Sequence, residues 1–394
     1  MSQFDFDTPV SIHGVWSRKW DYRKEQTGVA DVQPMWIADM DFETVPAVKE
    51  AIAERNKLGI YGYTAIDDTY HEAVLSWLSR RHGWDISADW LVHTPSVICG
   101  IQTAVRAFTE KDDPILVQPP VYHPFFRLIH QTRRTVLENP LIDRGDHYDI
   151  DWADLETKLE TAKIFILCNP HNPIGKIYTK EELKRIGDLV AKTNMLLVVD
   201  EIHGDLIAPD AEFTPYGTLG EKYAQSAIIC TAPSKTFNLA GLHLSNIVIP
   251  NEKLRSAFLD TFREAGIADP TVFSLVAANA AFREGDQWVD ELTAYLWKNR
   301  QIAEDYIREN IPQITAYHGV GTYFLWLDFR KLNLCNADLE RFLLEKAKIW
   351  ANQGHIFGKQ GSGFARLNLA LPASQLKEAL ERLAQAVKEL LKTI

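Results

Sequence analysis

Residues 227–241 read AIICTAPSKTFNLAG, and this stretch decides the fold class. Its first four residues are all apolar, which is typical of a buried strand. A turn of small and hydroxylated residues follows, and it contains one lysine, Lys235. A lysine just beyond the end of a buried strand is either an ordinary surface charge or a reactive amine held in a pocket.

Short apolar runs of this kind recur through the middle of the chain, with amphipathic helical patterns between them. The candidate strands are 91–94, 114–118, 163–168, 195–199, 227–230 and 246–249. Helical periodicity covers 97–110 and 179–193, and Thr179 and Glu182 form a capping box at the start of the second helix. This alternation predicts an α/β fold with a mostly parallel sheet flanked by helices.

The pattern changes near residue 285, which predicts a second and smaller unit. The elements expected there are helices at 286–310 and 373–392 and strands at 321–329 and 364–370. The first 45 residues show no clear helix and are expected to pack on this unit as an arm. We therefore predict a large domain over 46–285 and a smaller α+β domain built from 1–45 and 286–394.

The composition argues against several classes of protein. The chain has 394 residues, of which 46% are hydrophobic, so a sizeable core is expected. A formal net charge of −11 opposes binding to nucleic acid, and no basic cluster offsets it locally. No stretch approaches the roughly 20 apolar residues of a membrane span, and the first ten residues do not resemble a signal peptide. We expect a cytoplasmic protein with no membrane partner.

The cysteines and histidines give no metal-binding pattern. Cys99, Cys168, Cys230 and Cys335 are far apart in the sequence, as expected of free thiols in a reducing compartment. No CxxC or HxxxH spacing occurs, although twelve histidines leave an irregular site open. We predict no metal.

Polar residues follow several predicted strands at their carboxyl ends, where open α/β sheets bind ligands. They are Ser96 after 91–94, Asn169 and Asn172 after 163–168, Asp200 after 195–199, and Lys235 after 227–230. The sequence therefore predicts one site at this edge of the sheet.

The chain resembles the pyridoxal-phosphate (PLP) enzymes of the aspartate aminotransferase fold, which is fold type I. The motifs that carry the resemblance are NPHNPIG at 169–175, VVDEIHGD at 198–205, APSKTFNLAG at 232–241 and FARLNLALP at 364–372. Three segments are similar to the cystathionine β-lyase or cysteine-conjugate C–S lyase branch: MWIADMDF at 35–42, YGYT at 61–64 and SKTFNLAG at 234–241. The resemblance runs over nearly the whole chain and implies PLP as the cofactor.

The resemblance implies roles for the residues around the cofactor ring. Lys235 would hold PLP covalently and later move a proton, and Asp200 would keep the pyridine nitrogen protonated. Asn172 would donate to the phenolic oxygen, with His203 near the same edge, and Tyr122 would stack on the ring. Each has an ordinary alternative: a loop lysine, a helix cap, a turn asparagine, a structural histidine and a core tyrosine.

The phosphate is expected at the start of the helix over 97–110. By this matching, the amides of Val97 and Ile98 would bind it at the helix N-terminus, and Thr231 and Ser234 would add hydroxyl groups.

The substrate and a partner subunit also have implied contacts. In 364–370, alternation places Arg366 on one strand face, and the resemblance makes it the reader of the substrate α-carboxylate, together with Asn172 and Ala38. A solvent-facing arginine is the alternative. Tyr63 matches a tyrosine that reaches the phosphate of a second subunit, which implies a homodimer with shared active sites, and Tyr61 is the other candidate for that contact.

One departure bears on the reaction. Many aminotransferases of this fold carry an arginine eight residues after the lysine, whereas this chain has His243. With the segment 35–42, the departure favours a C–S β-lyase that converts L-cystathionine or related cysteine S-conjugates to a thiol such as homocysteine, pyruvate and ammonia. It also leaves the phosphate one cation short.

The alternatives are an amino-acid aminotransferase or a binding or regulatory protein that keeps the fold, although the presence of Lys235, Asp200 and Arg366 argues against a lost active site. The side-chain pocket has no motif, so the preferred conjugate is not predicted.

Overall fold

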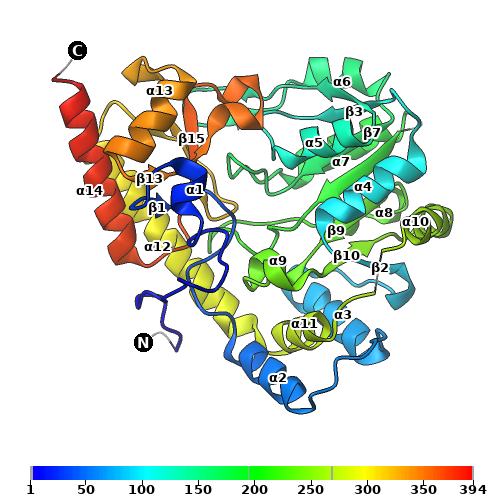
Figure 1. Cartoon of the computed structure of the whole chain (residues 1–394). Coiled ribbons are helices and arrows are strands. Elements are labelled where there is room, and N and C mark those ends of the chain that lie inside the picture. Colours follow the sequence, from blue (N-terminus) through cyan, green and yellow to red (C-terminus); the bar gives the residue numbers. More distant parts are fainter. Residues whose placement is uncertain (1–2, 194, 268, 393–394) are drawn as a thin grey trace.

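The computed structural model describes residues 3–193, 195–267 and 269–392, and their elements are organised around two main sheets (Figure 1). The strands of the larger sheet are β2 (Leu91–Thr94), β3 (Pro114–Val117), β4 (Thr135–Glu138), β7 (Ile164–Cys168), β8 (Leu196–Asp200), β9 (Ala227–Thr231) and β10 (Ser245–Val248). Their order is β2-β10-β9-β8-β7-β3-β4, in which β10 runs antiparallel to both neighbours and the other pairs are parallel. The mostly parallel sheet predicted from the sequence is confirmed.

Helices cover both faces of this sheet, which explains why its central strands β7, β8 and β9 are almost entirely apolar. The helices are α3 (Asp68–His82), α4 (Val97–Phe108), α5 (Pro124–Gln131), α6 (Trp152–Leu159), α7 (Lys180–Val190), α10 (Glu252–Glu264) and α11 (Val272–Glu284). Along β8, Leu197 and Val199 join one core with α3, α6, α7 and α11, whereas Leu196 and Val198 join a second core with α4, α5 and α10.

The smaller sheet is antiparallel and has the order β11-β12-β15-β14. Its strands are β11 (Thr315–Ala316), β12 (Phe324–Asp328), β14 (Asn352–Gln353) and β15 (Phe364–Asn368). The helices of this part of the molecule are α12 (Asp286–Asn310), α13 (Asn336–Arg341) and α14 (Ala373–Leu390). The arm joins this part of the molecule, because β1 (Gln33–Pro34) pairs in parallel with β13 (Ile349–Trp350).

Helix α12 runs between the two parts of the molecule (Figure 1). Its first half contributes Trp288 and Leu292 to the larger core, and its second half contributes Ala303 and Ile307 to a separate core under the smaller sheet. We keep domain boundaries after residues 45 and 285 as a proposal, with α12 as the element that the two units share.

The remaining α-helices and strands are short or lie outside the two main sheets. They are α1 (Arg23–Thr27), α2 (Pro46–Lys57), α8 (Glu221–Ala224), α9 (Pro233–Thr236), β5 (Ile142–Asp143) and β6 (Tyr148–Asp149).

Three of the differences from the sequence prediction have a clear structural cause. Strand β4 lies at the sheet edge with side chains that are at most partly buried, so it carries no apolar run. Helix α1 lies within the first 45 residues and buries no side chain, so no periodicity marked it. Strand β12 begins at Phe324 and not at residue 321, because Thr322 has a φ of 64°, which an extended strand cannot accommodate.

Across the described residues, no helix combines the length and apolar character needed to cross a membrane.

Candidate active site

A cavity of about 460 Å³ lies beyond the carboxyl ends of the parallel strands. The predicted site residues that line it are Ala38, Val97, Ile98, Tyr122, Asn172, Asp200, His203, Ser234 and Lys235. The loops after β2, β3, β7, β8 and β9 supply most of them, as expected of an open α/β sheet. The topology therefore gathers in one space side chains that are far apart in the sequence.

Lys235 lies in the single turn of α9, directly after β9. Its Nζ donates a hydrogen bond to the carbonyl oxygen of Ala38 at 3.0 Å, and no carboxylate of the described chain forms an ion pair with it. Desolvation in the cavity wall lowers the pKa of the amine, against the opposing influence of Asp39 and Asp200. A lysine with a lowered pKa has a larger neutral fraction and is a better nucleophile and base.

Asp200 ends β8 and is 3% exposed. Its Oδ1 accepts a hydrogen bond from the backbone N–H of Ile202 at 3.1 Å. Burial raises the pKa of the carboxyl to about 7, and the nearby Lys235 only partly opposes this. A buried carboxyl whose charged form is destabilised by desolvation fits a ligand that brings a positive charge or a proton into the cavity.

Arg366 lies in β15 and is 2% exposed, at the point where the smaller sheet approaches the cavity. Its two terminal nitrogens donate to Asn172 Oδ1 at 2.8 Å and to the carbonyl oxygen of Trp36 at 2.6 Å. Its Nε has no partner among the described residues, and burial lowers the pKa of the guanidinium to about 10. A buried cation with no anion and an unused N–H group fits a carboxylate ligand.

The alternation predicted for 364–370 explains this placement. Ala365 and Leu367 point into the core under the smaller sheet, whereas Phe364 belongs to the larger core on the opposite face. Arg366 shares that opposite face, and its Cζ lies 3.8 Å from the centre of the Phe324 ring.

His203 and Tyr122 complete the polar wall in neutral forms. His203 is 3% exposed, its Nδ1 has no partner in the described part of the chain, and burial lowers the imidazole pKa well below its usual value. Burial raises the pKa of Tyr122 to about 12. Both side chains therefore stay uncharged near neutral pH.

The N-terminus of α4 faces the same cavity. Ser96 caps the helix, with its Oγ accepting from the Cys99 N–H at 3.1 Å. Val97 and Ile98 lie in the first turn, where the helix itself offers no acceptor for their N–H groups. Ser234 and His243 line the cavity as well. This end of the cavity fits a phosphate group.

The donor set as a whole fits PLP. It offers the amine of Lys235, the buried carboxyl of Asp200 for a ring nitrogen, and the N-terminus of α4 for a phosphate. It also offers two buried nitrogen atoms that have no partner in the described chain, His203 Nδ1 and Arg366 Nε. No group of three or more His, Cys, Asp or Glu side chains in the described chain is placed to hold a metal ion.

Three predicted residues lie outside the cavity lining, and of these Arg366 is bonded to the lining residue Asn172. Thr231 lines a small neighbouring pocket, and its hydroxyl donates to the carbonyl oxygen of Asn246 at 3.1 Å. The side chain of Tyr63 is fully exposed, and Tyr61 contacts the ring of Phe273. The contacts expected for Thr231 and Tyr63 stay predictions.

The structure adds residues that the sequence analysis missed. Arg18 and Arg127 line the cavity, and the hydroxyl of Tyr323 donates to the carbonyl oxygen of Ala38 at 2.9 Å. Arg18 lies in the arm and Tyr323 just before β12, so only tertiary packing brings them here. Arg127 follows the PPVYHPF segment closely, and that proximity was the one available signal.

The chain belongs to a known family, because the model of the aminotransferase class I and II family matches residues 33–383. The fold type I family expected from the motifs is confirmed. Cystathionine β-lyase PatB of Bacillus subtilis is 39% identical, with 97% of this chain and all of that protein covered.

Two solved structures are also similar along their whole length. A PLP-bound putative aminotransferase from Clostridium difficile 630 has a TM-score of 0.95 and 39% identity, covering 98% of this chain and 100% of that one. Cystalysin from Treponema denticola, solved with pyridoxal 5'-phosphate, has a TM-score of 0.95 and 37% identity, covering 98% of this chain and 99% of that one.

Proposed function

We propose that the chain is a PLP-dependent carbon–sulfur β-lyase that cleaves L-cystathionine or related cysteine S-conjugates. The observation that carries the proposal is the cavity in which Lys235, Asp200 and Asn172 meet, with Arg366 bonded to its wall. The resemblance to PatB, a cystathionine β-lyase that aligns over its full length, supports the choice of reaction.

When bound, PLP supplies an electron sink for the charge that develops at the substrate Cα. Lys235 would hold the cofactor through Nζ and, once released, would take the Cα proton. Asp200 would keep a proton on the ring nitrogen, and Asn172 would donate to the phenolic oxygen. Arg366 would grip the α-carboxylate and so orient the Cα–H bond toward Lys235. Overall, L-cystathionine and water give homocysteine, pyruvate and ammonia.

The test is an incubation with PLP and L-cystathionine in the absence of any 2-oxo acid, followed by separate assays of thiol, pyruvate and 2-oxobutyrate. A β-lyase forms thiol and pyruvate in equal amounts. A keto product that appears only after a 2-oxo acid is added would indicate an aminotransferase. Formation of 2-oxobutyrate would indicate cleavage on the other side of the sulfur.

The proposal includes a homodimer with shared active sites. Leu58, Ile60, Tyr61 and Tyr63 form an exposed apolar segment before α3, which supports a protein partner at this place. Tyr61 is engaged within the chain, since its hydroxyl donates to Asn56, whereas Tyr63 is 109% exposed. This difference favours Tyr63 as the residue that reaches a second subunit.

Mixing two impaired variants tests the shared site. Lys235→Ala and Tyr63→Phe homodimers should regain activity when their subunits exchange, because one site of the mixed dimer contains both native residues. Tagged chains must show that exchange occurs. Exchange without activity above the sum of the parents would transfer the test to Tyr61→Phe.

A cytoplasmic location is also part of the proposal, and the four free thiols support it.

A further inference from the structure

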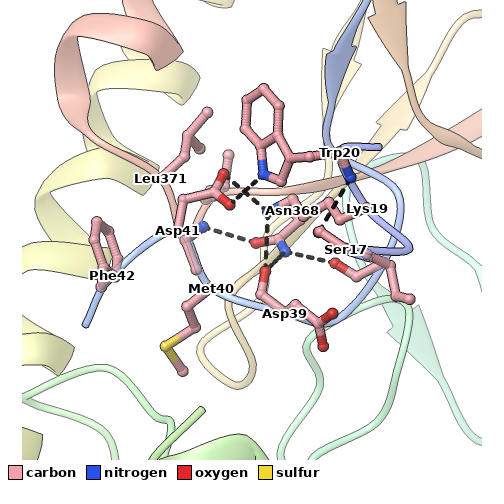
Figure 2. Close-up of polar contacts among 12 residues, drawn as sticks. Ser17, Lys19, Trp20, Asp39, Met40, Asp41, Phe42, Asn368 and Leu371 are labelled. Carbon is pink, nitrogen blue, oxygen red and sulfur yellow. Dashed lines mark hydrogen bonds and ion pairs between the residues drawn. The ribbon is translucent and has the colours of Figure 1, made fainter. Parts of the chain in front are cut away.

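A buried ion pair fixes residues 17–20 of the arm to the segment 36–42 (Figure 2). Lys19 Nζ lies 2.9 Å from Asp41 Oδ2, and both side chains are 3% exposed. Lys19 also donates to the carbonyl oxygen of Asp39 at 3.0 Å, and Trp20 Nε1 donates to Asp41 Oδ1 at 2.9 Å. Burying two charges is costly without good geometry, and here each charge has further hydrogen bonds. The backbone on the C-terminal side of Arg18 is therefore held firmly.

The segment 36–42 is itself fixed to the walls of the cavity. Asn368 at the end of β15 donates to the carbonyl oxygens of Ile37 and Asp39 at 2.7 and 2.8 Å. Asn238, beyond α9, donates to those of Met40 and Phe42 at 3.1 Å each. The ion pair thus ties residues 17–20 to a later segment of the same arm, and both parts of the molecule hold that segment.

Arg18 projects from this anchored arm to the cavity lining. Its guanidinium lies 5.6 Å from the centre of the Trp36 ring, which stacks on Trp350 at 4.5 Å. No ion pair or hydrogen bond joins this guanidinium to any described residue, including Asp39. A cation at a cavity of a chain with net charge −11 is thus left without an anion.

Trp36 also links Arg18 to Arg366. The ring of Trp36 lies by Arg18, and its carbonyl oxygen accepts from Arg366. Two guanidinium groups therefore flank Trp36: that of Arg18 in the cavity lining, and that of Arg366, which is bonded to the lining residue Asn172. Arg366 is buried and already fits the α-carboxylate, so Arg18 is placed for a second anionic group on the same substrate.

We propose that Arg18 binds a carboxylate carried by the sulfur substituent of the substrate, so that the enzyme prefers cysteine S-conjugates with an anionic leaving group. The inference rests on the proposed β-lyase function, since it divides the substrate into an α-carboxylate end and a leaving-group end. Arg127, the other arginine of the lining without an ion pair in the described chain, is the rival reader.

The experiment compares conjugates that differ by one charge. S-carboxymethyl-L-cysteine and S-carbamoylmethyl-L-cysteine have nearly the same shape, and the corresponding S-carboxyethyl and S-carbamoylethyl pair extends the reach by one methylene. The measured quantity is the ratio of kcat/KM within each pair, for the PLP-loaded enzyme. Because Arg18 is exposed, we expect the parent to favour the carboxylate by roughly fivefold, and less in high salt.

Arg18→Gln should bring this ratio close to one. Arg106→Gln is the matched control, because Arg106 is an exposed arginine in the last turn of α4 and its loss changes the net charge equally. The control should keep the parent ratio. A second readout does not depend on turnover. L-2-aminoadipate and its side-chain amide have the shapes of the carboxymethyl and carbamoylmethyl conjugates, with a methylene group in place of the sulfur. Calorimetry should show that the parent binds the acid more tightly than the amide and that Arg18→Gln loses this preference.

Several results would overturn the inference. If the parent cleaves both conjugates without preference, the anion site is absent although the β-lyase function stands. If no conjugate is cleaved, the proposed function fails, and the calorimetric comparison still decides the anion site. A preference that survives in Arg18→Gln and is lost in Arg127→Gln makes Arg127 the reader. Weaker PLP binding in Arg18→Gln with an intact preference places Arg18 at the phosphate.

Discussion

Asp200→Asn should stabilise the cofactor-free protein while it abolishes most turnover. The carboxyl is buried at the end of β8, and its pKa is raised from 3.8 to about 7. The amide of asparagine keeps the oxygen that accepts from the Ile202 N–H. It removes the charge that is costly to bury, so the folded state becomes more stable. It also removes the carboxylate that would keep a proton on the ring nitrogen of PLP, so turnover falls.

The sign and size follow from linkage between protonation and folding. A carboxyl whose pKa is higher in the folded state binds protons more tightly there, so its contribution to stability falls as pH rises from about 4 to about 7. At about 1.36 kcal/mol for each pH step, the cost of Asp200 is at most about 4 kcal/mol at pH 8 and about 2 kcal/mol at pH 5. For a chain of 394 residues, about 4 kcal/mol corresponds to roughly 5 °C in Tm.

The assay is the Tm of parent and variant without PLP from pH 5 to pH 8. The advantage of Asp200→Asn should grow with pH and level off above pH 7. Asp205→Asn is the control, for which we expect a loss of stability. Burial alone would raise the pKa of Asp205, but the pair with His82 and the hydrogen bond from Thr236 outweigh it and lower the pKa. A lower Tm for Asp200→Asn at pH 8 would refute the view that its charge is buried at a cost.

Two further substitutions test the remaining roles. Lys235→Ala should abolish turnover and covalent attachment of PLP, measured as the mass of the protein after borohydride reduction; a retained PLP mass would remove Lys235 from this role. Arg366→Lys should raise KM by roughly 10-fold to 100-fold with a smaller change in kcat, because a point charge cannot reproduce the two-pronged carboxylate contact. Equal KM values in parent and variant would leave Arg366 as a structural residue.

The fold was predictable where local pattern and burial agree. The central strands β7, β8 and β9 of the larger sheet are almost entirely apolar because helices cover both faces. Helix α7 begins at the capping box of Thr179 and Glu182, as expected. Strand β4 and helix α1 were missed because neither buries a continuous apolar face, so the sequence has no period to detect there.

The site was predictable where a residue lies at the carboxyl end of a strand or just beyond it. Asp200 and Lys235 have this position, and the end of a parallel strand points to the ligand edge of the sheet. Arg18 and Tyr323 have no such marker, because the arm and the smaller sheet reach the cavity only through tertiary packing. No local sequence pattern indicates which distant segments meet at the cavity.

The arm explains how groups from the two sheets keep a fixed spacing. Arg366 of the smaller sheet donates to the carbonyl oxygen of Trp36, and Lys235 beyond the larger sheet donates to that of Ala38. These acceptors are two residues apart in one segment, so any relative shift of the two sheets would stretch at least one of the two bonds. Tyr323 donates to the same oxygen of Ala38 as Lys235, so this carbonyl keeps a donor when the amine moves away to act on substrate. The arm therefore holds Arg366, the proposed carboxylate reader, in place while Lys235 makes the motion that the proposed reaction needs.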